Sequence, residues 1–237
     1  MKYTRTLLVY LIFSFIAAVL IILVVGTIPS HIQPISLLEK VGLACVFIFC
    51  CIIGISFTLH PNWARRYFSK FKDEEKNTLL QVKREFQGHH PDCSTFQNHT
   101  IQWKKKTWCA GCLGLFIGLC VSILLMILYM ITDFQLTNMM FILLILLGLF
   151  ILPVVYVEII YRTRYAIVHV FINSMLPLSF FIITISVGGF TGKFVYGFFT
   201  ILLCFLWLDT RIQLSKWHHR LLCTNCLESC KMFTVRI

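Results

Sequence analysis

Charged residues are scarce in this chain. Asp, Glu, Lys and Arg make up 13% of its 237 residues, whereas a soluble domain contains about 25%. Hydrophobic residues make up 58%, and the mean hydropathy is +0.83. Internal repeats and low-complexity tracts are also lacking. A charge deficit of this size excludes an ordinary soluble domain, so the composition predicts an integral membrane protein with one membrane domain and small attachments.

Six stretches are apolar enough to cross a bilayer, which takes about 20 residues in a helix. The first five are free of Asp, Glu, Lys and Arg. The sixth has only 15 residues between Lys193 and Asp209, so we expect it to borrow length from Gly188–Gly192 or to let Lys193 reach the interface. The stretches are Leu7–Val25, Val41–Leu59, Ala110–Thr132, Met139–Val157, Ala166–Val187 and Phe194–Leu208. The predicted fold is an all-α, six-helix transmembrane bundle.

Positive charge is nearly absent from one side of this bundle. With six spans, both chain ends and the even-numbered connections share a side that carries 19 Lys and Arg residues, and only Lys40 and Lys193 lie opposite. Because positive charge stays cytoplasmic, we expect a cell membrane protein with both termini in the cytoplasm. The basic face would attract anionic membrane lipid. No stacking motif accompanies the basic residues, so a nucleic-acid partner is not expected.

The prediction divides the chain into four parts. Residues 1–59 hold the first two helices, and the first is expected to be an uncleaved helix, since its apolar run is longer than a signal core. Residues 60–108 form a cytoplasmic connection, in which Trp63–Phe86 has the spacing of one or two amphipathic surface helices. Residues 109–208 hold helices three to six. Residues 209–237 form a Cys-rich tail, and Arg211–Leu222 is predicted to be helical, continuing the sixth span.

The 11 cysteines fall into two groups. Five lie inside apolar spans, where a thiol behaves as a small buried hydrophobe. Six lie on the predicted cytoplasmic side, where thiols stay reduced and structural disulfides are rare. The six are Cys93, Cys109, Cys112, Cys223, Cys226 and Cys230. Metal binding or redox chemistry is therefore the first interpretation of this second group.

Two ligand pairs have the spacing of a two-knuckle zinc site. His90 and Cys93 are separated by two residues, as are Cys109 and Cys112, and 15 residues separate the pairs. Three thiolates and one imidazole form a tetrahedral set that suits zinc. His89 or His99 could replace His90, because sequence alone does not choose between neighbours.

The tail offers a second candidate set. It comprises His219, Cys223, Cys226 and Cys230. These residues could bind their own ion or join the first set in a two-metal site. Iron or an iron–sulfur cluster fits less well than zinc, because the surrounding sequence matches neither ferredoxin pattern.

Two further features allow interpretations other than zinc binding. The segment Trp108–Cys112 resembles a thioredoxin-type dithiol at a helix N-terminus, although no βαβ pattern surrounds it. Within the fifth span, His169 and Asn173 are four residues apart and share a helix face. Polar residues inside a membrane face the bundle, where they line a pathway or hydrogen-bond to other helices.

Glu158 and Arg162 have the spacing of an interfacial ion pair.

The segment His89–His99, followed by Cys109–Gly118, resembles a family of small membrane proteins catalogued as domain of unknown function 2085. In that family a His/Cys-rich segment precedes Cys-x-x-Cys-Thr-Gly at the start of a helix. Here Leu113 stands in place of the Thr, and the tail cluster has no counterpart in the pattern. The resemblance implies a site at this junction but supplies no reaction.

Three functions remain open from the sequence. In the first, a closed zinc-type site has a structural role or binds a cytoplasmic protein partner. In the second, a metal-dependent membrane enzyme acts on a lipid or lipid-linked substrate, with Asp92 as the nearest carboxylate base. In the third, the chain is a dithiol redox protein, a metal sensor or a transporter. The sequence does not determine the oligomeric state.

Overall fold

The computed structural model describes residues 2–27, 35–59, 86–87, 99–103, 106–132, 136–161 and 165–224. Six helices in these ranges are long and apolar enough to cross a membrane. They are α1 (Lys2–Thr27), α2 (Leu37–Leu59), α4 (Ala110–Ile131), α5 (Asn138–Tyr161), α6 (Ala166–Thr191) and α7 (Phe194–Thr224). This confirms the predicted number of apolar helices and fits an integral membrane protein.

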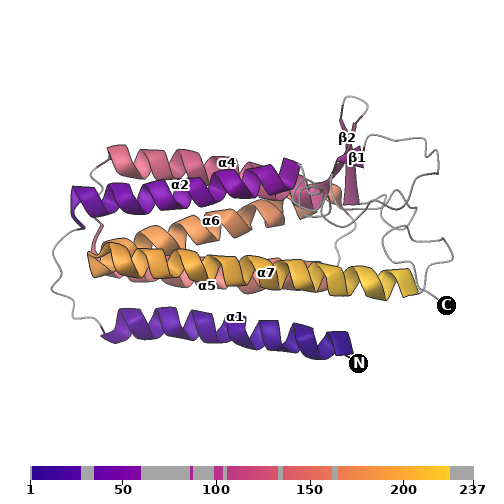
Figure 1. Cartoon of the computed structure of the whole chain (residues 1–237), viewed down its shortest axis with the longest axis horizontal. Helices are drawn as coiled ribbons and strands as arrows, with labels where there is room; N and C mark the ends of the chain where they lie inside the picture. The colour runs from indigo at the N-terminus through magenta and orange to yellow at the C-terminus, as the bar shows by residue number, and fades with distance from the viewer. Residues whose placement is uncertain are drawn as a thin grey trace, which may run out of the picture.

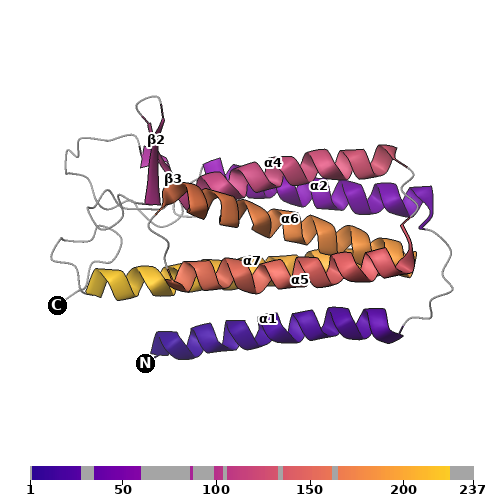
Figure 2. The same cartoon turned by 180° about the vertical axis from the view of Figure 1, so that it is seen from behind.

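The helices run side by side with α6 in the middle. In Figure 1 and Figure 2, α2 and α4 lie together on one side of α6, α5 and α7 lie on the other, and α1 forms the far edge. Helix α6 contacts α1, α4, α5 and α7. Its sequence explains this position, because it is rich in small and polar residues that allow close packing and interhelical hydrogen bonds.

Glycine brings α4 and α6 together. A Cβ atom on Gly114 would overlap the carbonyl oxygen of Val170, and one on Gly118 would overlap that of Ser174. Both glycines lie on one face of α4, four residues apart, so the two backbones pack directly against each other there.

Helix α1 is joined to α5 and α7 by polar contacts deep in the bundle. The indole Nε1–H of Trp207 donates to the carbonyl oxygen of Ser14 at 3.1 Å, and the hydroxyl of Tyr156 donates to the carbonyl oxygen of Trp207 at 2.9 Å. The Ser14 hydroxyl lies 3.3 Å from the Tyr156 hydroxyl. These bonds satisfy polar groups that would otherwise be stranded in an apolar core.

The sixth span reaches its length in a different way from the predicted borrowing of Gly188–Gly192. Helix α6 continues through Gly188 to Thr191, and Gly192, at φ 63°, ends it in the left-handed conformation that glycine adopts without strain. The sixth span therefore borrows no residues from Gly188–Gly192. Helix α7 instead continues past Asp209 to Thr224 as one helix of 31 residues, which confirms that the predicted tail helix extends the sixth span.

At the end of the bundle where α1 begins and α7 ends lies a small sheet (Figure 1). Its strands are β1 (Phe86–Gln87), β2 (Thr100–Trp103) and β3 (Lys106–Cys109), in the order β1-β3-β2, with β1 parallel and β2 antiparallel to β3. We call this end the sheet end. Phe86, predicted as the last residue of a surface helix, lies in β1; the rest of that predicted helix lies outside the described residues.

At the opposite end of the bundle, Lys40 joins α2 to the end of α4. Its Nζ donates to the carbonyl oxygen of Thr132 at 3.0 Å and lies 4.7 Å from the centre of the Tyr129 ring. Lys40 was predicted to lie in a connection, but it is a buried residue in the first turn of α2. A cation at the C-terminus of α4 is favourable, because the last carbonyl groups of a helix carry partial negative charge.

Candidate functional site

The two cysteines of the predicted second ligand pair meet where β3 becomes α4. Cys109 is the last residue of β3 and precedes the first residue of α4, and pairing of Cys109 with Thr100 holds it against β2. Cys109 is 2% exposed and Cys112 is half-buried. A hydrogen bond with the Cys112 thiol, together with burial, raises the pKa of the Cys109 thiol. The two sulfur atoms are therefore close enough to act on one ligand.

A guanidinium group lies next to this pair. Arg211 of α7 reaches across to α4, where its Nη2 atom borders the space that a Cβ on Gly111 would fill, at 3.0 Å. The Cys109 sulfur borders the same space at 3.9 Å. A side chain at this point of α4 would crowd the guanidinium, so glycine allows its close approach.

Asn173 fixes the position of Arg211. Its Oδ1 atom accepts from Arg211 Nε at 3.2 Å and also from Nη2. The Asn173 amide is oriented in turn, because its Nδ2 donates to the carbonyl oxygen of His169 at 2.7 Å. Within the described part of the chain, no carboxylate forms an ion pair with Arg211. The guanidinium is therefore held by a neutral amide.

The Glu158 carboxylate pairs with a histidine rather than with Arg211. The Glu158 carboxylate, near the end of α5, contacts Nδ1 of His169, near the start of α6, and both side chains are buried. The ring of His99, just before β2, lies against that of His169, with centroids 4.1 Å apart. An imidazole oriented by a carboxylate presents its second nitrogen in a fixed direction.

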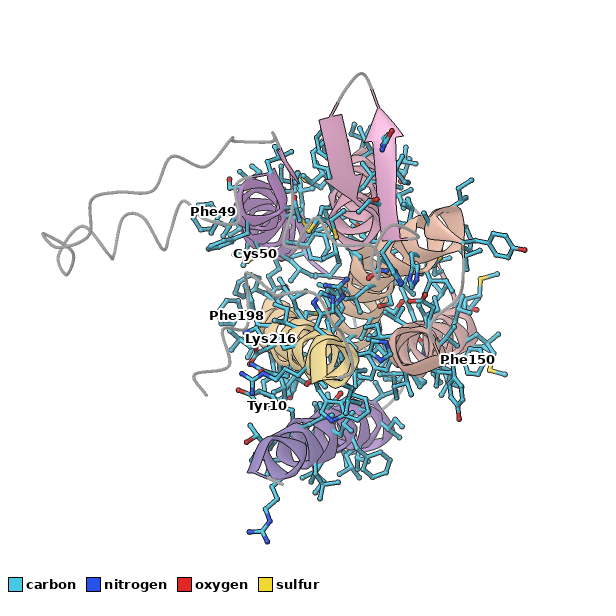
Figure 3. All side chains as sticks on the ribbon, turned by 90° about the vertical axis from the view of Figure 1, so that its right-hand side faces the viewer. Tyr10, Phe49, Cys50, Phe150, Phe198 and Lys216 are labelled. Carbon is cyan, nitrogen blue, oxygen red and sulfur yellow. The ribbon has the colours of Figure 1, made fainter. Side chains whose placement is uncertain are left out.

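Figure 3 looks on to the sheet end. Labelled Phe49 and Phe150 project away from the bundle, whereas nitrogen and oxygen atoms gather between the ribbons of α4, α5, α6 and α7. We call the residues that meet here the polar cluster. Its members are His99, Cys109, Cys112, Glu158, His169, Asn173 and Arg211.

The structure brings some of the predicted site residues together. His99, Cys109 and Cys112 lie at the sheet end, and His169 and Asn173 are buried, as the pattern on α6 predicted. His219 is half-buried on α7, and Cys223 lies in the last turns of that helix. The residues outside the described ranges are His89, His90, Cys93, Cys226 and Cys230.

Metal ligation itself stays a prediction. Among the described residues, no three His, Cys, Asp or Glu side chains are grouped so that they could hold a metal ion. Two of the four residues in the first predicted set, and two of the four in the tail set, are outside the described ranges. The described half of the first set, Cys109 with Cys112, is paired as a metal site or a dithiol requires.

Sequence reasoning missed Arg211 and the contact between Glu158 and His169 on the next helix. The predicted pairing of Glu158 with Arg162 stays a prediction, because Arg162 lies outside the described residues. Arg211 was assigned to a cytoplasmic helix with no role in the site. The available signal was that both charged residues lie within a few residues of a predicted membrane boundary.

No family model, curated protein or solved structure matches this chain. The resemblance to domain of unknown function 2085 therefore stays a prediction.

Proposed function

We propose that the chain is a multi-pass protein of the cell membrane that binds a zinc ion at the sheet end, with both termini in the cytoplasm. Cys109 and Cys112 provide two ligands, and His90 and Cys93 complete a Cys₃His set. Such a closed set fixes structure or binds a partner rather than activating water. The ion would fasten the connection between α2 and α4 to the bundle, and a cytoplasmic protein would recognise the ordered surface.

The observation that carries the proposal is the pairing of Cys109 with Cys112 at the β3–α4 junction. Their thiols hydrogen-bond to one another, as two thiols brought together for a shared ligand would. The hairpin of β2 and β3 supports this arrangement, because it directs the chain before Cys109 back across the same end of the bundle. Zinc prefers thiolate and imidazole ligands, which this segment supplies.

Metal analysis of the detergent-purified protein tests the proposal. The wild type should carry zinc, and Cys109→Ser and Cys112→Ser should each lose it. Cys45→Ser is the matched control, because Cys45 is an exposed thiol on α2 away from the cluster. Zinc retained by both ligand variants would refute the site. A metal-free wild type with a Cys109–Cys112 disulfide would support the dithiol alternative instead.

The tail residues His219, Cys223, Cys226 and Cys230 are proposed as a second zinc set. Helix α7 supports this, since it carries His219 and Cys223 at the sheet end. Loss of one zinc per chain on deletion of residues 223–237, with the other retained, is the expected result. Unchanged zinc content in that truncation would refute the second set.

The buried contact between Glu158 and His169 favours a second candidate function, a metal-dependent enzyme acting on a membrane lipid or lipid-linked substrate. A carboxylate-oriented imidazole is a common general base. In that case the metal would have three protein ligands and a water. Spectroscopy of the cobalt-substituted protein distinguishes the two functions, because a closed thiolate set gives tetrahedral spectra that do not change on addition of small anions, whereas an open site exchanges its water.

A further inference from the structure

One face of α7 carries large apolar side chains first and cations after them. The exposed and half-buried residues of this face recur every three or four positions, so they lie on one side of the helix. In order toward the sheet end, they are Val195, Phe198, Leu202, Phe205, Asp209, Gln213, Lys216 and Arg220. We call this face the α7 strip. Its four apolar side chains are 37% to 66% exposed, and its two cations are exposed as well.

The α7 strip has other helices on both sides. Helix α7 contacts α1 and α2. Figure 3 shows that residues of all three helices lie along the same side of the bundle, where it labels Phe49 of α2, Phe198 and Lys216 of α7, and Tyr10 of α1. A molecule lying on the strip would therefore also border α1 and α2.

Lys216 lies at the depth of lipid headgroups. A helix rises 1.5 Å per residue and the hydrocarbon core is about 30 Å thick, so about 20 residues cross it. Counted from Phe194, the first residue of α7, that length ends about three residues before Lys216. The aromatic residues agree with this depth. Ile159 of α5 packs in one cluster with Leu214, and Tyr161, just beyond it, is 80% exposed, as expected for a tyrosine at the headgroup level.

The side chains of the strip suit a lipid better than a second helix. Helices that pack closely in a membrane use small residues at the contact, as Gly114 and Gly118 do between α4 and α6. The apolar part of the strip has only Val, Phe and Leu side chains, which would hold another helix at a distance. Flexible acyl chains can follow such a surface. In the described part of the chain Lys216 forms no ion pair, so its charge is available to a phosphate.

The carboxylate on the strip lies deeper than the cations. Asp209 Oδ1 accepts from Gln213 Nε2 at 3.3 Å. Asp209 is seven residues nearer the bilayer centre than Lys216, a distance of about 10 Å along the helix. It therefore lies below the layer of the phosphates and leaves the positive end of the strip at their level.

We propose that the α7 strip binds an anionic phospholipid of the leaflet at the sheet end. An acyl chain lies along Phe198, Leu202 and Phe205, and the headgroup phosphate lies at Lys216. Arg220, one turn further on, adds positive charge at the outer edge of the headgroup layer. The inference does not depend on the proposed zinc site, because the predicted zinc ligands include no residue of the strip.

Native mass spectrometry of the detergent-purified full-length protein, with phosphatidylglycerol and phosphatidylcholine of identical chains, tests the headgroup preference. The wild type should prefer phosphatidylglycerol. Lys216→Gln should lower this preference about fivefold, the equivalent of about 1 kcal/mol for one basic residue near a membrane surface, and Lys216→Arg should keep it.

Arg5→Gln is the matched control for charge. Arg5 is an exposed cation of α1 at the same end of the bundle. It lies two residues before Leu7, which packs in one cluster with Leu214 of α7, so Arg5 is on the side of α1 that faces away from α7. Its replacement should leave the preference unchanged. A wild type without preference would overturn the inference, as would an Arg5→Gln variant that loses as much of it as Lys216→Gln does.

Photocrosslinking in vesicles with equal amounts of the two lipids tests where the lipid lies. Phe205→p-benzoylphenylalanine should capture phosphatidylglycerol in excess, and this excess should disappear when Lys216→Gln is added. The same replacement at Phe150 is the control, since Phe150 is 67% exposed on α5, on the other side of the bundle (Figure 3); it should capture both lipids in proportion to the mixture. Equal capture of the two lipids at Phe205 would overturn the inference. Capture of a second copy of the chain there would also overturn it, in favour of a protein interface.

Discussion

Substitution of Gly114 by alanine should separate α4 from α6 and destabilise the protein. A Cβ at this position would overlap the Val170 carbonyl oxygen and lie 2.9 Å from the Asn173 Cβ. The oxygen belongs to the backbone of a buried helix, so rotation of a side chain cannot relieve the overlap. The helices must move apart beside the polar cluster.

Two opposing effects decide the size of the change. Alanine is favoured over glycine in a helix by about 1 kcal/mol. Forcing an extra carbon into a packed core costs about 1–3 kcal/mol, occasionally more. Because the overlap is with backbone, we expect the second effect to win, with a net loss of about 1–2 kcal/mol after the helix gain is subtracted from the upper part of that range. For a chain of this length, this corresponds to a fall in Tm of roughly 2–8 °C.

The assay is thermal unfolding of the purified protein in detergent. Gly26→Ala is the matched control, since a Cβ there would have no atom within 4 Å; its Tm should stay the same or rise slightly. Gly118→Ala should resemble Gly114→Ala, because its Cβ would meet the Ser174 backbone. A Gly114→Ala protein as stable as the Gly26→Ala protein would refute the reasoning that the α4–α6 contact requires glycine.

Three further predictions concern polar contacts in the bundle. Glu158→Ala removes one partner of the buried pair with His169 and should cost about 3–5 kcal/mol of unfolding free energy, measured by chemical denaturation; Lys216→Ala should change it by no more than about 0.5 kcal/mol. Trp207→Phe deletes the indole N–H bond to Ser14 and should cost about 1–3 kcal/mol, with faster hydrogen exchange in α1; unchanged exchange there would show that this bond does not hold α1. Lys40→Met removes the charged bond to the Thr132 carbonyl and should cost about 1.5–3 kcal/mol, with faster exchange in the last turn of α4 and not in its first.

The number and positions of the membrane helices were predictable, because a bilayer sets a minimum length for an apolar run and charged residues interrupt such runs. The start of α4 at Ala110 matches the prediction, and its end at Ile131 differs by one residue. The helix predicted for Arg211–Leu222 as a continuation of the sixth span ends two residues before α7 does. Asp209 and Arg211 end the apolar run, but a charge does not end a helix, and α7 continues through both.

The candidate site was predictable only in part. The spacing of Cys109 and Cys112, and of His169 and Asn173, follows from local periodicity, and the structure places all four at the sheet end. The approach of Arg211 to the Cys pair depends on how α7 packs against α6, which no local pattern contains.

Local spacing could not show the contact that Glu158 makes with another helix. A basic residue four positions on is a favourable helical neighbour, but the contact of the carboxylate with the His169 imidazole joins α5 to α6. The sheet was missed for a related reason: its strands have two to four residues, too few to show alternation, and their register is set by the hairpin.

The central claim is a zinc–thiolate centre built on Cys109 and Cys112, and X-ray absorption at the zinc edge tests it most directly. To isolate the first site, the measurement is made on protein lacking residues 223–237. The account predicts one zinc per chain with sulfur neighbours at about 2.3 Å and a nitrogen neighbour at about 2.0–2.1 Å, in a ratio of three to one. Zinc surrounded only by oxygen and nitrogen, or a purified wild type without metal, would contradict it.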